Sequence, residues 1–112
     1  MNLRELKSLL ENSTEENLEF DEPHVSLRCG ENNLKKESVI HTLLKETNKL
    51  THFIEDRPKV YKLYFKLTER RQLKVIIDIL KPKRIMIRTV KILDRKLYKN
   101  TKLINLKKRR FW

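Results

Sequence analysis

The first half of the chain repeats its apolar residues at the spacing of α-helices. The segment NLRELKSLLEN predicts a short amphipathic helix over residues 2–12, and the polar run STEEN at 13–17 is interpreted as a linker. A clearer helix is predicted from NLKKESVIHTLLKE, with Asn33 as its N-cap. One face of that helix carries five apolar residues: Leu34, Val39, Ile40, Leu43 and Leu44.

Residues 23–29, between these two segments, fit two structures. Pro23 can occupy the first turn of a helix, whereas the alternation of Val25, Leu27 and Cys29 fits a strand. Periodicity alone does not choose between them. His24 and Arg28 stand four residues apart in this stretch. The sequence leaves open whether they form a working pair or lie on a solvated face.

After residue 48 the period changes from helical to alternating. Four segments predict strands: LTHFIED, VYKLYFKL, LKVIIDIL and RIMIRTVKIL. In the second of these, Leu63 and Phe65 point to one side of the sheet, and Lys62 and Tyr64 point to the other. The links TERRQ and KPK are short, which predicts antiparallel hairpins.

This order of elements predicts an α+β domain. We expect an antiparallel sheet of three to four strands, packed on one face by two or three N-terminal helices. The other face should be partly polar, with Lys62, Tyr64 and Arg88 on it. The chain is predicted to form a single domain, 1–112, with three parts: an N-terminal helix and linker at 1–17, a core at 18–98 and a basic tail at 99–112.

The charge of the chain is distributed unevenly. Residues 1–56 hold 7 Lys and Arg against 12 Asp and Glu, a net charge of −5. Residues 57–112 hold 20 against 3, a net charge of +17, so the chain as a whole carries +12. Unpaired cations attract polyanions, of which nucleic acid is the commonest in cells. The alternative is a chain that is merely basic and soluble.

Several classes of protein and site are disfavoured by composition. No apolar run approaches the roughly 20 residues that span a bilayer, and the acidic N-terminus is not a signal peptide. The single cysteine, Cys29, excludes an internal disulfide and is interpreted as a small buried residue. The three histidines lack metal-binding spacing, and a single glycine excludes a phosphate-binding loop. A cytoplasmic protein without membrane, metal or small-molecule cofactor is expected.

Several segments together resemble a known family. PHVSLRC, with its H-x-x-x-R pattern, precedes a short helix, and THFIEDRPKVYKLYFKL, RQLKVIIDIL and RIMIRTVKILDRKLY follow. Over residues 18–98 the chain resembles the DUF4258 group of small archaeal and bacterial proteins, which are similar to the RelE/ParE and BrnT toxin superfamily. The resemblance implies a RelE-like core and, for the better-known relatives, cleavage of mRNA on or off the ribosome. It also implies RNA, the ribosome or an antitoxin protein as a partner.

Metal-independent cleavage of RNA needs a base, a proton donor and cations around the phosphate. RelE-like sites are rich in Arg and Lys, with an occasional Tyr or His, and this chain can supply such a set. We assign four residues as candidate catalytic groups: His24, Arg28, Tyr64 and Arg88. Five more are assigned as nucleic-acid contacts: Arg57, Lys62, Lys74, Arg95 and Tyr98.

Structural roles are open for most of these residues. His24 and Arg28 could brace a helix, Arg57 could simply end a strand before Pro58, and Lys62 and Tyr64 could solvate the exposed face. Arg88 lies inside an apolar run, where a guanidinium requires an anion or a carboxylate partner such as Asp78. The leading hypothesis is a toxin-type RNA-binding protein with endoribonuclease activity. The alternatives are a non-catalytic nucleic-acid-binding domain and a protein-interaction domain.

Overall fold

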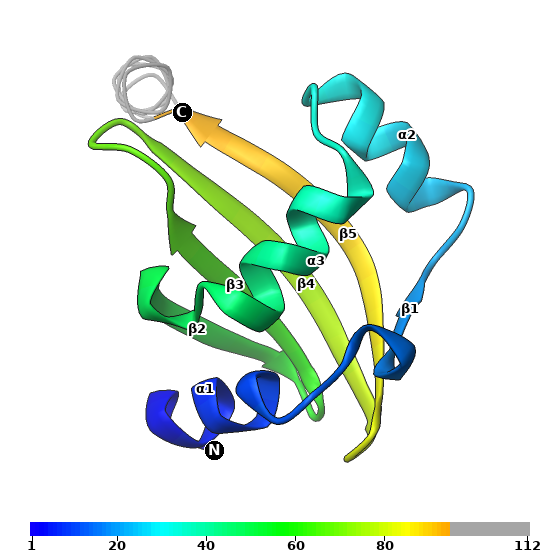
Figure 1. Ribbon diagram of the computed structural model, residues 1–112, viewed down its shortest axis with the longest axis vertical. Helices are drawn as coiled ribbons and strands as arrows, with labels where there is room; N and C mark the ends of the chain where they lie inside the picture. The colour runs from blue at the N-terminus through cyan, green and yellow to red at the C-terminus, as the bar shows by residue number, and fades with distance from the viewer. Residues whose placement is uncertain (95–112) are drawn as a thin grey trace, which may run out of the picture.

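A five-stranded sheet and three helices make up the computed structural model, which describes residues 1–94 (Figure 1). The helices are α1 (Leu3–Glu11), α2 (His24–Glu31) and α3 (Lys36–Lys45), with 3₁₀ turns at Glu15–Asn17 and Thr47–Lys49. The strands are β1 (Leu18–Phe20), β2 (Leu50–Arg57), β3 (Val60–Lys66), β4 (Arg71–Lys81) and β5 (Arg84–Asp94). The predicted α+β class is compatible with this architecture, and all four predicted strands are present.

The sheet differs from the prediction by its first strand. Its order is β1-β5-β4-β3-β2, and β1 pairs in parallel with β5 through Leu18 opposite Ile85. The sheet is therefore mixed rather than wholly antiparallel. With only three residues, β1 is too short to show an alternating pattern, and no strand is predicted for it from the sequence.

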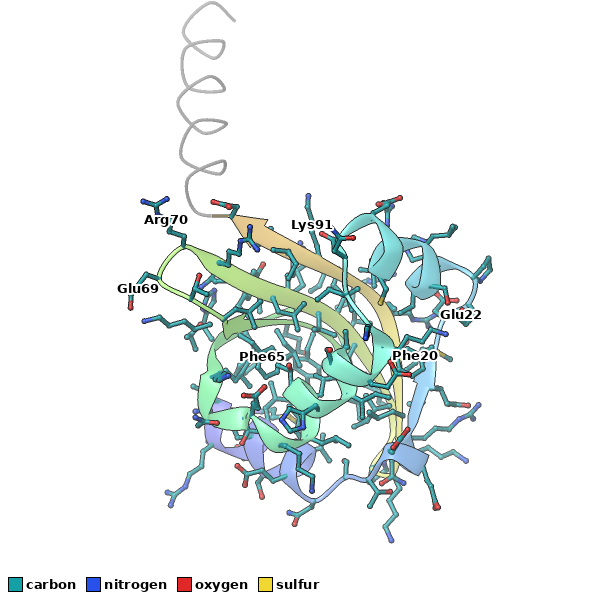
Figure 2. The ribbon with its side chains drawn as sticks, turned by 45° about the horizontal axis from the view of Figure 1, so that its top comes forward. Phe20, Glu22, Phe65, Glu69, Arg70 and Lys91 are labelled. Atoms are coloured by element: carbon teal, nitrogen blue, oxygen red, sulfur yellow. The ribbon has the colours of Figure 1, made fainter. Side chains whose placement is uncertain are left out.

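The core lies between one face of the sheet and the helices α1 and α3. In Figure 1, α3 lies across that face, and α1 lies below β2. Alternate residues of the three long antiparallel strands point inward, as predicted for Leu63 and Phe65. Figure 2 shows Phe65 within this core. The buried residues of β3, β4 and β5 on the inward face are Tyr61, Leu63, Phe65, Leu73, Val75, Ile77, Ile85, Ile87 and Val90.

Residues 23–29, which the sequence left undecided, are helical. In α2, Val25 and Cys29 are buried one turn apart, while Leu27 is 62% exposed. Cys29 is buried as predicted, and this burial raises the pKa of its thiol. The helix packs along the part of β5 that extends beyond β1. There the amide N–H of Ile92 donates to Oδ1 of Asn32 at 3.0 Å, so the end of α2 satisfies a donor on the edge of the sheet.

The N-cap predicted for the next helix is wrong. The cap residue of α3 is Lys35, whereas Asn33 has a φ of 54°. Asparagine tolerates this left-handed conformation, which turns the chain after α2. The amide of Asn33 donates to the carbonyl oxygen of Gly30 at 3.3 Å. Asn33 therefore ends one helix rather than beginning the next.

An ion pair fastens β1 to the sheet. The Nε of Arg84 donates to Glu19 at 2.6 Å, and this hydrogen bond is the main cause of the lowered pKa of the Glu19 carboxyl. Because the folded-state pKa lies below the ordinary value of 4.5, the unfolded chain binds this proton more readily. The ion pair with Arg84 therefore stabilises the fold fully above pH 4.5, and this stabilisation is lost as the pH falls through the folded-state pKa of Glu19.

We expect Glu19→Gln to lower the melting temperature at neutral pH and to have no effect in strong acid. Thermal unfolding of the two proteins across a pH series measures the difference. Glu16→Gln is the control, since Glu16 is exposed and has no ion pair within residues 1–94. A difference for Glu19→Gln that persisted undiminished in acid would show that the pairing with Arg84 is not its origin.

Candidate nucleic-acid interface

The face of the sheet opposite α1 and α3 is lined mostly by polar and cationic side chains. The alternation of β3, β4 and β5 directs their intervening residues to this side, which we call the open face. Its residues include Lys62, Tyr64, Lys74, Ile76, Thr89 and Lys91. The prediction that Lys62 and Tyr64 point away from the core is confirmed, because each is aligned with these residues rather than with the buried set.

Strand register places four of these side chains in one line across the open face. His52 of β2 is opposite Tyr64 of β3, Tyr64 is opposite Lys74 of β4, and Lys74 is opposite Lys91 of β5. Adjacent strands are about 4.8 Å apart, so the row extends over roughly 15 Å. We call it the cross-strand row. It begins with two aromatic rings and ends with two cations.

The aromatic end of the row is well ordered. The rings of His52 and Tyr64 are stacked, with centroids 4.4 Å apart and planes inclined by 6°. Thr51 Oγ1 donates to the carbonyl oxygen of Tyr64 at 3.1 Å and lies 2.9 Å from Nδ1 of His52. Because the Thr51 hydroxyl has only one proton, this geometry favours a proton on Nδ1 of His52, which leaves Nε2 as the acceptor.

The cationic end of the row lacks counter-charges of its own. Lys74 is half-buried, and its pKa is lowered, first by burial and then by the neighbouring charges of Lys62 and Lys91. Asp56 opposes that shift, but it forms its ion pair with Lys62 at 3.7 Å. Neither Lys74 nor Lys91 has a carboxylate partner in the described part of the chain. Like charges directly opposite each other destabilise a sheet, so an anion between these two lysines would offset their repulsion.

A groove of about 410 Å³ separates α2 from the cationic end of the row. Its lining residues are Arg28, Glu31, Asn32, Lys74, Ile76, Thr89, Val90 and Lys91. Figure 2 shows Lys91 next to the last turn of α2. The guanidinium of Arg28 donates to Glu31 at 2.9 Å, and both side chains are largely exposed at the rim. The end of α2 thus forms a wall at the edge of the open face.

The predicted site residues fall into separate groups. Lys62, Tyr64 and Lys74 lie on the open face, and Arg28 joins them across the groove. Arg88 occupies a bulge in β5 and donates to Asp78 at 2.9 Å and to Asp21 at 3.5 Å. Its pKa is raised, chiefly by the hydrogen bond to Asp78. The pairing with Asp78 that the sequence suggested is confirmed, and it gives Arg88 a structural role.

The other predicted residues are not brought to the groove. His24 is exposed at the start of α2 and is not among the groove residues, and its side chain makes no hydrogen bond or ion pair within 1–94. Arg57 ends β2 in an exposed position, 3.8 Å from Asp56. Arg95 and Tyr98 lie outside the described residues. His24 and Arg28 share a helix, but only Arg28 lines the groove.

Three contributors to this surface were missed by sequence reasoning. His52 and Lys91 belong to the cross-strand row, and Asn32 lines the groove. His52 was considered only as a metal ligand. Its position on a predicted strand, two residues before Ile54, was a usable signal for its face, but only the register could place it opposite Tyr64.

Comparisons of the chain with protein-family models, curated proteins and solved structures find no match. Within the part of the chain that the structure describes, no helix is long and apolar enough to cross a membrane. The same residues contain no group of three or more His, Cys, Asp or Glu side chains arranged to hold a metal ion.

Proposed function

We propose that this protein binds single-stranded RNA on the open face of its sheet. The observation that supports the proposal most strongly is the cross-strand row. A stacked His52 and Tyr64 adjoin Lys74 and Lys91, which have no carboxylate partners among residues 1–94. Bases stack on aromatic rings, and phosphates require cations within a few ångströms, so one strand could satisfy both ends of the row.

The shape of the surface favours a single strand over a duplex. Sequence-tolerant stacking requires bases that are not paired, and an open sheet presents its aromatic side chains to splayed bases. The charge around the face favours a polyanion. Residues 57–94 contain 12 Lys and Arg but only three acidic residues, namely Glu69, Asp78 and Asp94. The resemblance noted above selects RNA rather than DNA for the first test.

Binding is supported better than cleavage by the present geometry. A nuclease of the expected type would bring His24 or Tyr64 together with Arg28 and Arg88. Arg88 is occupied by Asp78 and Asp21, and His24 lies outside the groove. Tyr64 and the cations of the row remain in a position to contact a strand. We therefore propose a binding function and treat metal-independent cleavage as an outcome of its test.

We expect Tyr64→Ala to weaken binding to a single-stranded oligoribonucleotide by about tenfold, because loss of one stacking platform costs about 1–3 kcal/mol. Tyr64→Phe should retain most of the affinity, since it keeps the ring. Fluorescence anisotropy at several salt concentrations measures both variants, and the affinity of every binding-competent form should fall steeply with salt.

A cleavage assay on the same variants separates the alternatives. End-labelled RNA incubated with the protein in EDTA reports cleavage, and fragments that disappear in Tyr64→Ala would establish nuclease activity on this face. Undetectable binding at low salt would overturn the proposal. Equal affinities for wild type and Tyr64→Ala would remove the aromatic platform from the interface.

A further inference from the structure

We propose that the groove between α2 and the sheet binds a terminal phosphate of the RNA strand. This inference rests on the proposed function and specifies which part of the strand ends in the groove.

The row leads into the groove and stops there. From Tyr64 the line of side chains crosses β4 at Lys74 and β5 at Lys91. Beyond Lys91, the C-terminal end of α2 forms the far side of the groove with Arg28, Glu31 and Asn32. A strand that followed the row from the aromatic rings would therefore meet a wall rather than continue over the edge of the sheet.

The charge of the groove suits a phosphomonoester. Arg28, Lys74 and Lys91 contribute three positive charges to its lining, and Glu31 contributes one negative charge, which leaves a net charge of +2. A terminal phosphate carries about −1.5 to −2 at neutral pH, whereas a phosphodiester within a strand carries a single negative charge. The pair Lys62–Asp56 lies nearby and adds no net charge. The groove thus matches the end of a strand better than its interior.

Donors for the phosphate oxygens are present at suitable places. The ammonium groups of Lys74 and Lys91 form no ion pair within the described residues, and the hydroxyl of Thr89 makes no hydrogen bond there. Asn32, by contrast, is already used, because its Oδ1 accepts from Ile92 and its Nδ2 donates to the carbonyl oxygen of Arg28. Glu31 restrains Arg28 at 2.9 Å, and a bound phosphate would compete for that guanidinium.

The distance between Tyr64 and Lys91 also fits a short terminal segment of the RNA strand. Lys91 lies two strand spacings from Tyr64, about 10 Å, which roughly two nucleotides of an extended strand can bridge. The base that stacks on His52 and Tyr64 would then be near the end whose phosphate occupies the groove.

The test compares the ends of otherwise identical oligoribonucleotides of about eight nucleotides, carrying a 5′-phosphate, a 3′-phosphate or neither. Each competes against an internally labelled strand for the full-length protein, and inorganic phosphate is a separate competitor. We expect one of the two phosphorylated ends to bind about tenfold more tightly than the unphosphorylated strand. The end that is preferred gives the polarity of the bound strand.

Three variants assign the preference to the groove. Lys91→Gln should abolish it, and Glu31→Gln should enlarge it by releasing Arg28. Lys83→Gln removes the same charge from the exposed β4–β5 turn, roughly 25 Å along β5 from Lys91, and should leave the preference intact. Thermal unfolding confirms that each variant is folded.

The outcomes distinguish the inference from the function on which it rests. Equal affinities for phosphorylated and unphosphorylated strands would overturn the inference and leave RNA binding in place, as would a preference that survived in Lys91→Gln. Competition by inorganic phosphate as strong as that of the phosphorylated strand would show a site for free phosphate, and it would likewise contradict the inference. Absence of binding to every oligonucleotide would overturn the proposed function itself.

Discussion

Leu10→Ala is expected to lower the free energy of unfolding by about 3 kcal/mol, because it removes a fully buried side chain and leaves a cavity. Leu10 belongs to α1, which packs against α3 and β2 as part of the common core. The end of α1 is also fastened to the following part of the chain, since the hydroxyl of Thr47 donates to the carboxylate of Glu11. The first helix is thus a structural part of the domain.

Denaturant unfolding of wild type and variant measures this effect. Leu9→Ala is the matched control, because it makes the same substitution one residue earlier at a position that is only partly buried. It should cost less than about 1 kcal/mol. If Leu10→Ala were as mild as Leu9→Ala, α1 would not share the core, and the packing described for it would be wrong.

The strands were predictable because alternation is a strong signal when one face is buried. Tyr61, Leu63 and Phe65 are buried, and Lys62 and Tyr64 turn to the other side, as their spacing indicates. The first helix was predictable for the same reason, with Leu6 and Leu10 fully buried four residues apart.

The structure of residues 23–29 was not predictable from periodicity. Val25 and Cys29 are four residues apart, and this spacing places both on one side of a helix and on one side of a strand. Only Leu27 distinguishes the two, since it would be buried in a strand and is exposed in α2. Residues 23–29 are helical because α2 packs against the edge of β5, and that contact joins residues far apart in the sequence.

The candidate interface was predictable in its charge but not in its geometry. The excess of cations after residue 56 is evident from the sequence. Which cation stands next to which depends on the register of four strands and on bulges such as the one between Leu50 and His52. Arg88 illustrates the limit, because the sequence proposed both a phosphate contact and a pairing with Asp78, and only the structure shows the pairing.

Lys74→Glu is expected to reduce the affinity for single-stranded RNA by about a hundredfold, the largest effect of any single substitution on the open face. The change removes a central cation of the cross-strand row. It also places a carboxylate between Lys62 and Lys91, which would pair with them in place of a phosphate.

The folding stability of Lys74→Glu should not fall with its RNA affinity. In the wild type, Lys74 and Lys91 oppose each other directly across β4 and β5 with like charges. In the variant the same positions carry opposite charges, so the folded state should be as stable as the wild type or more stable. A loss of binding without a loss of stability is typical of a residue retained for function.

The most direct test of the proposed interface is therefore the RNA affinity and melting temperature of Lys74→Glu, measured beside those of Lys83→Glu. Both variants alter the net charge of the chain equally, but Lys83 lies on the exposed β4–β5 turn and outside the row. We predict a loss of about a hundredfold for Lys74→Glu with an unchanged or higher melting temperature, and only about a threefold loss for Lys83→Glu. Equal losses in the two variants would contradict a defined binding surface on the open face and leave only a general attraction between a basic protein and a polyanion.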